Sequence, residues 1–231
     1  MLSWRSEPPA LPTDGETLVH RVRPAAGDPS GLLVLHHGRG TDEEDLLGLA
    51  DFLDPERSLQ VVAPRAPFRL ESSPGYHWYV VREVGYPDPD TFHASYSRLT
   101  AFHDTLWANT GIPPERTVLG GFSMGSVMSY VTGLGTGRPR PAGILAFSGF
   151  VPTVEGWEPD LESRADLPVL IAHGRRDPVI DVQFARRARA LLEAGGLSVQ
   201  YLESEVGHQI DPAHVAEARR WIADCLGHSQ R

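Results

Sequence analysis

Residues 121–125 read Gly-Phe-Ser-Met-Gly, a run that places a serine hydroxyl where it could act as a nucleophile. The short run 116–119 before it favours a β-strand, and residues 126–131 after it can continue as a helix. A serine at a strand-to-helix turn is the arrangement of a nucleophile elbow, and this tight turn requires residues without a Cβ two positions before and after the serine. Both positions are glycine here. The sequence therefore predicts that Ser123 lies at a helix N-terminus, where the helix dipole favours developing negative charge.

The pentapeptide alone is weak evidence, because a chain with 23 glycines contains such a run by chance about 0.15 times. The simpler interpretation is a glycine-rich turn that carries a solvated serine. A serine hydroxyl is a weak nucleophile, so the chemical interpretation also needs a base that takes its proton and an acid that orients the base.

Asp177 and His208 have the residue types and the chain positions for these two roles. Asp177 follows the predicted strand at residues 167–172, and His208 follows the one at residues 199–202. The order serine, aspartate, histidine, each after a strand, is the order expected for hydrolases built on an α/β sheet. His208 would take the proton of Ser123 and return it to the leaving group, while Asp177 would fix the His208 tautomer and stabilise the imidazolium.

Simpler roles exist for both residues, and other carboxylates compete for the acidic position. Asp177 could initiate a turn before the proline that follows it, and His208 could be an ordinary loop histidine. Asp181 and Asp211 are expected to cap helices, and Glu205 is close to His208 in the sequence. Asp177 is preferred because it alone lies in a short loop directly after a strand.

The tetrahedral intermediate of acyl transfer carries an oxyanion, which needs two fixed N–H donors worth roughly 3–4 kcal/mol each. One expected donor is the backbone N–H of Met124, the residue after the serine. The other is expected from the loop after the early strand at residues 32–36, where the backbone N–H of Arg39 is the best placed.

Strand and helix patterns alternate along the chain. Continuous apolar runs, typical of buried parallel strands, occupy residues 32–36, 59–63, 143–147 and 167–172. Amphipathic helices are predicted at residues 91–108 and 211–226, and residues 41–44 match a capping box that would open another helix. The alternation predicts an α/β fold with a mostly parallel central sheet and helices on both faces, whose active site lies at the carboxyl ends of the strands.

The segment 67–90 has no clean period and is predicted to be a long loop rich in aromatic residues. Trp78 and Tyr79 within it, and Phe150 later in the chain, fit either the core or an acyl pocket. The chain is short for this fold, so little or no helical lid is expected and the site should be open.

Four histidines fall at predicted strand ends, namely His36, His37, His173 and His208. Their spacing matches no helical or hairpin pattern of metal ligands, so we expect no metal site. His37 and His173 are expected to have structural roles beside the site, and His93 and His103 are expected on helix surfaces.

The length of 231 residues fits one domain, which we expect at residues 15–231 after a poorly ordered segment at residues 1–14. The net charge of −9 argues against nucleic acid and against stable membrane association. A single cysteine and a start without the apolar core of a signal peptide favour a cytoplasmic protein.

Five stretches of this sequence resemble the phospholipase/carboxylesterase family, which includes acyl-protein thioesterases and small bacterial carboxylesterases. They are residues 35–41 (Leu-His-His-Gly-Arg-Gly-Thr), 121–125, 148–149, 173–179 and 207–208. The resemblance implies an α/β-hydrolase fold, a triad of Ser123, Asp177 and His208, and no cofactor. On this interpretation we assign substrate binding to Trp78, Tyr79, Phe150 and Val179.

The sequence therefore predicts a serine carboxylester hydrolase that acts on small-molecule esters of short to medium acyl length through an acyl-enzyme intermediate. An acyl-thioesterase or a lysophospholipase with the same triad is the alternative within enzymes. From another class, a catalytically silent α/β-hydrolase fold could serve for binding, although it would have no chemical need for all three triad residues. A homodimer is left open.

The Arg39 assignment predicts that the backbone matters there and the guanidinium does not. On a neutral ester, Arg39→Ala should keep kcat within about tenfold of the wild type, because a partly exposed charge is worth little. Arg39→Pro removes the N–H and should lower kcat by roughly 10²–10³, with the fold checked separately. If alanine is as damaging as proline, the side chain is the working part.

Overall fold

The computed structural model describes residues 17–71 and 73–227. The expected poorly ordered segment at residues 1–14 lies outside these ranges. Within them, no helix combines the length and the apolar character of a membrane span.

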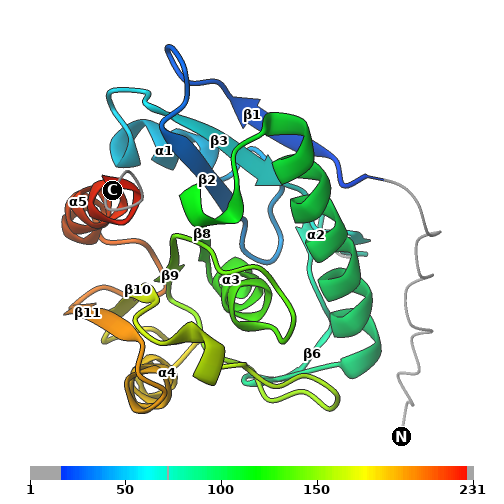
Figure 1. Cartoon of the computed structure of the whole chain (residues 1–231). Helices are drawn as coiled ribbons and strands as arrows, with labels where there is room; N and C mark the ends of the chain where they lie inside the picture. The colour runs from blue at the N-terminus through cyan, green and yellow to red at the C-terminus, as the bar shows by residue number, and fades with distance from the viewer. Residues whose placement is uncertain (1–16, 72, 228–231) are drawn as a thin grey trace, which may run out of the picture.

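A seven-stranded sheet runs through the centre of the molecule (Figure 1). In spatial order its strands are β1 (His20–Arg23), β3 (Leu59–Pro64), β2 (Gly31–His36), β8 (Thr117–Phe122), β9 (Gly143–Phe147), β10 (Pro168–Gly174) and β11 (Ser198–Ser204). Only β1 at one edge pairs antiparallel, and each of the other pairs is parallel. The predicted, mostly parallel sheet is therefore confirmed.

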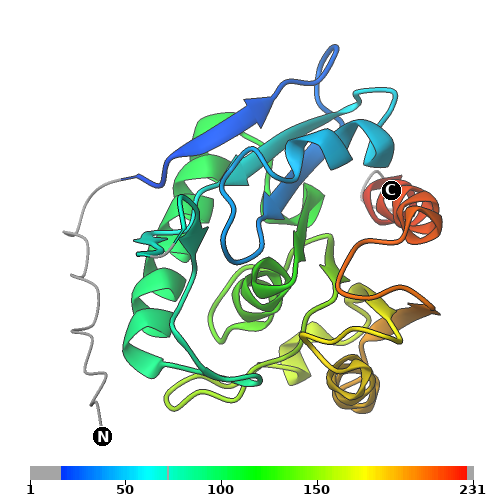
Figure 2. The same ribbon diagram turned by 180° about the vertical axis from the view of Figure 1, so that it is seen from behind.

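Helices cover both faces of the sheet, as predicted (Figures 1 and 2). One face carries α2 (Pro89–Thr110), α3 (Met124–Leu134) and α4 (Val182–Ala194), and the other carries α1 (Leu47–Leu53) and α5 (Pro212–Gly227). Short 3₁₀ turns lie at Pro114–Arg116 and Glu162–Arg164. Successive side chains of a strand point to opposite faces, so β2 sends Leu32 and Val34 into one core and Leu33 and Leu35 into the other.

The capping box expected at residues 41–44 is wrong. Helix α1 begins only at Leu47, and its N-cap residue makes no side-chain cap. The Thr41 hydroxyl instead donates to the carbonyl of Gly38, at 3.0 Å, and the Thr41 backbone pairs with Tyr76. The Thr41 hydroxyl and backbone are thus engaged in the turn at Gly38 and in the pairing with Tyr76, and not in a helix cap.

The segment predicted as one long loop contains two short hairpins. Strands β4 (Phe68–Arg69) and β5 (Tyr76–His77) form the first, and β6 (Val81–Glu83) and β7 (Tyr86–Pro87) form the second. The five α-helices that the structure describes lie against the faces of the sheet, so the carboxyl ends of the strands are bordered by loops and by these hairpins.

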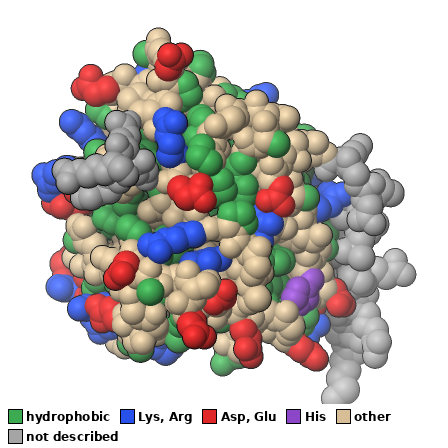
Figure 3. Space-filling model, viewed as in Figure 1, with side chains coloured by type: hydrophobic (Ala, Val, Ile, Leu, Met, Phe, Trp, Pro, Cys, Tyr) green, Lys and Arg blue, Asp and Glu red, His purple; other side chains and the backbone are tan. Residues whose placement is uncertain are grey.

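Acidic and basic side chains are interspersed over the face shown in Figure 3, with apolar atoms between them. The surplus of acidic residues in the composition therefore does not gather into a single acidic patch on this face.

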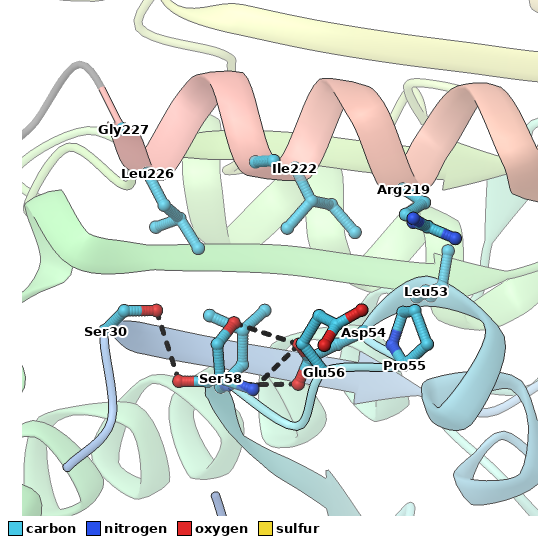
Figure 4. A pocket seen from close by; sticks show the side chains of 12 residues that line it. Ser30, Leu53, Asp54, Pro55, Glu56, Ser58, Arg219, Ile222, Leu226 and Gly227 are labelled. Carbon is cyan, nitrogen blue, oxygen red and sulfur yellow. Dashed lines mark hydrogen bonds between the residues drawn. The ribbon is translucent and has the colours of Figure 1, made fainter. Parts of the chain in front are cut away.

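A buried ion pair ties the edge strand to the rest of the sheet at the other end of the molecule. Arg23 of β1 donates to Asp54 at 2.5 Å, and both side chains are less than a tenth exposed. The second oxygen of Asp54 accepts from the backbone N–H and the hydroxyl of Ser58 (Figure 4). These bonds close the turn between α1 and β3, beneath α5.

Removing the Asp54 carboxylate should destabilise the fold strongly. Asp54→Ala leaves the buried Arg23 guanidinium without its buried charge partner and should lower the free energy of unfolding by about 3–5 kcal/mol. Asp51 is the matched control, because it also contacts Arg23 but is half exposed, and Asp51→Ala should cost less than about 1 kcal/mol. Urea denaturation of both variants measures the difference, and equal losses would contradict it.

Candidate active site

Ser123 connects β8 to α3 in a strained conformation, with φ 55° and ψ −120°. The turn closes only because its neighbours are small. A Cβ at Gly121 would lie 2.5 Å from the backbone of Gly125, and a Cβ at Gly125 would lie 1.9 Å from the carbonyl oxygen of His36. Strain at a backbone position persists where the surrounding structure enforces it, which is common at functional sites.

The structure brings the three predicted triad side chains into one hydrogen-bonded chain. His208 Nε2 lies 2.9 Å from Ser123 Oγ, and His208 Nδ1 lies 2.7 Å from Asp177 Oδ2. Ser123 is 8% exposed and the His208 side chain 18%, so the hydroxyl and its base are nearly buried but reachable. The three residues come from the ends of β8, β10 and β11, which the parallel sheet places along one edge.

Backbone groups hold the Asp177 carboxylate. Its Oδ1 accepts from the N–H groups of Val179 and Ile180 at 2.8 and 2.9 Å, and its side chain is fully buried. His173 lies on its other side, with Nε2 donating to the carbonyl of Ile180 at 2.8 Å. Asp177 therefore presents Oδ2 to His208 in one fixed direction.

The competing carboxylates are engaged elsewhere. Asp181 accepts from the backbone of Gln183 at the start of α4, and Asp211 accepts from Ala213 at the start of α5. Glu205 pairs with Arg175. Among these candidates, only Asp177 contacts His208 in the structure.

The two expected oxyanion donors belong to α3 and to the loop after β2. Met124 is the first residue of α3, so its N–H has no carbonyl partner within the helix. The loop after β2 packs directly against the serine, since a Cβ at Gly38 would lie 3.6 Å from the Ser123 Cβ. Arg39 is the next residue of this loop.

The Arg39 side chain points into solvent and forms no ion pair with any residue that the structure describes. Glu43, which is close in the sequence, uses both oxygens on Arg65 at 2.5 and 2.6 Å. The pKa of Glu43 is lowered, because these bonds outweigh the opposing effect of burial. An Arg39–Glu43 pair is therefore not formed.

His37 fixes the direction of the Arg39 N–H. Its Nε2 accepts from the N–H of Ala66 at 2.9 Å, so the proton is on Nδ1, which donates to the Gly38 carbonyl at 2.7 Å. That carbonyl and the Arg39 N–H belong to one planar trans peptide group and point in opposite directions. Burial lowers the pKa of His37, which keeps this neutral tautomer in place.

Comparison with known proteins shows the family of this chain. The sequence model of the Phospholipase/Carboxylesterase family matches residues 19–226. The chain belongs to this family. An acyl-protein thioesterase 1 of Debaryomyces hansenii is 29% identical to it over 224 residues, which are 89% of this chain and 96% of that protein.

Solved structures show the same α/β-hydrolase fold. Esterase PE8 has a TM-score of 0.80 and 32% identity, covering 91% of this chain and all of that one. A carboxylesterase of Bacillus cereus has a TM-score of 0.78 and 22% identity, covering 90% of this chain and 94% of that one. The predicted family and fold are thereby confirmed.

The four residues assigned to substrate binding fall in different places in this family member. Trp78 and Tyr79 are 0% and 2% exposed and belong to the core between the sheet and α2, so they form no open wall. Phe150 is also buried, but it packs on Phe184 and borders a cavity of about 580 Å³ beside α4 and the β6–β7 hairpin. Val179 is 54% exposed on the loop that holds Asp177.

His103 was expected on a helix surface, and that prediction is wrong. It is 1% exposed, and its Nε2 lies 3.2 Å from that of His36. Its position four residues after Leu99 and three before Leu106 puts it on the apolar face of α2, a signal present in the sequence.

The His36–His103 pair is hydrogen-bonded to α3, the helix that follows Ser123. Ser129 donates to the Gly125 carbonyl at 3.1 Å and so accepts from His36 Nδ1 at 2.8 Å. His36 Nε2 must then accept from His103. Burial, with a contribution from the neighbouring imidazole, lowers the pKa of His36, and burial lowers that of His103. Both rings are therefore neutral.

Across the described ranges, no three His, Cys, Asp or Glu side chains form a group that could hold a metal ion. The histidines at the strand ends form hydrogen bonds with protein groups; these residues are His36, His37, His173 and His208.

The Asp177 geometry predicts a large effect of a small substitution. Asp177→Asn can still accept from Val179 and Ile180, but its neutral amide cannot stabilise an imidazolium, so kcat should fall by on the order of 10⁴. Asp211→Asn, which preserves a helix cap, should leave kcat within about twofold. The measurement is kcat for ester hydrolysis by the two folded variants. A larger loss of kcat in Asp211→Asn than in Asp177→Asn would refute the assignment of Asp177.

Proposed function

We propose that this member of the phospholipase/carboxylesterase family hydrolyses carboxylic esters through a covalent acyl-serine. The observation that carries the proposal is the continuous chain of hydrogen bonds from Asp177 through His208 to Ser123. It supplies a nucleophile, a base and an orienting acid within hydrogen-bond reach of one another.

In the first half-reaction, Ser123 Oγ attacks the ester carbonyl carbon as His208 Nε2 takes the hydroxyl proton. The tetrahedral intermediate expels the alcohol, which receives that proton from His208, and the acyl group remains on the serine. In the second half-reaction, His208 takes a proton from water, whose oxygen attacks the acyl carbon. Collapse releases the carboxylic acid and returns the proton to Ser123, and Asp177 stabilises the imidazolium in both halves.

The oxyanion of each tetrahedral intermediate would accept hydrogen bonds from the backbone N–H groups of Met124 and Arg39. Support comes from the helix position of Met124 and from the way His37 aims the Arg39 peptide. Donors fixed before the reaction stabilise developing charge without having to reorient.

We propose small-molecule esters of short to medium acyl length as the substrates. Support comes from the described helices, which lie on the sheet faces and leave the carboxyl ends of the strands bordered by loops and short hairpins. The similarity to an acyl-protein thioesterase favours thioesters as the second substrate class, since the same triad would cleave them. We further propose that the protein acts in the cytoplasm and binds no nucleic acid. Both a monomer and a homodimer are compatible with this function.

Covalent labelling tests the proposed nucleophile. A fluorophosphonate probe should add its mass to Ser123 of the wild type and to none of the residues of Ser123→Ala. Ser123→Ala and His208→Ala should each lose nearly all turnover, because triad members act as a unit. Activity of either folded variant within about tenfold of the wild type would refute the triad assignment. A wild type that is neither labelled nor active would favour a binding protein on this fold.

A graded substrate series tests the proposed substrate class. With p-nitrophenyl esters, kcat/KM should rise over the first few carbons by the gain of about 0.8 kcal/mol per buried methylene and then level off. Matched acyl-thioesters separate the two substrate classes by their kcat/KM ratio. A jump in rate at the solubility limit of the substrate would contradict an open site for small esters.

A further inference from the structure

Trp78 contacts both segments that supply the proposed oxyanion donors. Its indole Nε1–H donates to the carbonyl of His37 at 2.9 Å, and its backbone N–H donates to the Sδ atom of Met124 at 3.2 Å. His37 and Met124 are far apart in the sequence, and Trp78 belongs to a third segment, directly after β5.

Trp78 is itself held in one place. Its side chain is 0% exposed, and its ring packs edge-on against His36 and obliquely against His37, with ring centroids 5.7 and 5.5 Å apart. Its carbonyl accepts a short hydrogen bond from Ser95 of α2. A side chain enclosed in this way has few alternative rotamers, so it can fix the groups that it bonds.

The hydrogen bond from the Trp78 indole holds His37, the residue that orients the Arg39 N–H. His37 aims the Arg39 N–H through the Gly38 carbonyl, so any movement of His37 turns that peptide plane. Beyond it, the loop is already tied to β5 by the Gly40 N–H, which donates to Tyr76 at 2.8 Å. Trp78 bonds to the other end of the loop, at His37, which directly follows the last paired residue of β2.

We propose that Trp78 is a positioning residue for the oxyanion hole, which it serves by fixing the His37 carbonyl and the start of α3 relative to each other. This inference rests on the proposed esterase function. Trp78 touches no reacting atom, and its effect should appear in the transition state and not in substrate binding.

The test compares Trp78→Phe with Trp157→Phe. Both tryptophans are buried in the same core, but the Trp157 ring packs against Phe92 of α2 and not against the loop after β2. Trp78→Phe should lower kcat by on the order of 10²-fold with little change in KM, because a small misplacement of a catalytic group costs that much. Trp157→Phe, which is remote from the reacting groups, should stay within about threefold of the wild type.

The affinity for a trifluoromethyl ketone gives a readout that general loosening of the core would not move. This inhibitor forms a tetrahedral adduct with the serine, so its Ki in Trp78→Phe should rise by the same factor as kcat/KM falls. Equal kcat losses in the two tryptophan variants, or an unchanged Ki in Trp78→Phe, would overturn the inference. A wild type that neither hydrolyses esters nor binds this ketone would instead defeat the proposed function.

A milder pair of variants keeps the inference testable if Trp78→Phe fails to fold. Ser95→Ala removes the bond to the Trp78 carbonyl and should lower kcat and the ketone affinity about fivefold, the size of one neutral hydrogen bond. Thr132→Ala is its control, since that buried hydroxyl donates only within its own helix. Equal activities and ketone affinities of these two variants would overturn the role of Trp78.

Discussion

The close approach of α3 to the end of β2 is the constraint on which the rest of the site depends. Gly125, in the first turn of α3, lies so near the carbonyl of His36 that no side chain fits between them. This contact fixes Ser123, which begins the helix, relative to the loop that leaves β2. Nucleophile and loop come from neighbouring strands, so their separation is set by main-chain packing and not by flexible side chains.

The buried histidines around the site differ from His208 in the hydrogen bonds that their rings make. His36, His37 and His103 are enclosed, and their hydrogen bonds specify one neutral tautomer each. Among the histidines that the structure describes, only His208 combines a carboxylate on one nitrogen with a serine hydroxyl on the other. The enclosed rings therefore form a fixed scaffold, and the proposed proton transfers are confined to a single ring.

The sequence predicts the residues of the site that lie directly after strands. Ser123, Asp177 and His208 each follow an apolar run, and a parallel sheet places such positions along one edge. It does not predict contacts that depend on three segments meeting. Thr41 matched a local cap but its backbone pairs with Tyr76, and Trp78 fitted a pocket wall but its indole bonds to the His37 carbonyl. Local patterns cannot distinguish these outcomes, because the competing partners are distant in the chain.

The buried histidines also couple the fold to acidity. Burial lowers the pKa values of His36, His37 and His103 in the folded protein below the ordinary value of 6.5. Below that pH the unfolded chain binds protons at these rings that the folded chain excludes. Their contribution to stability is therefore complete above pH 6.5 and declines as the pH falls toward the lower folded values. The imidazoles that shape the site thus make unfolding a proton-consuming step in mildly acidic solution.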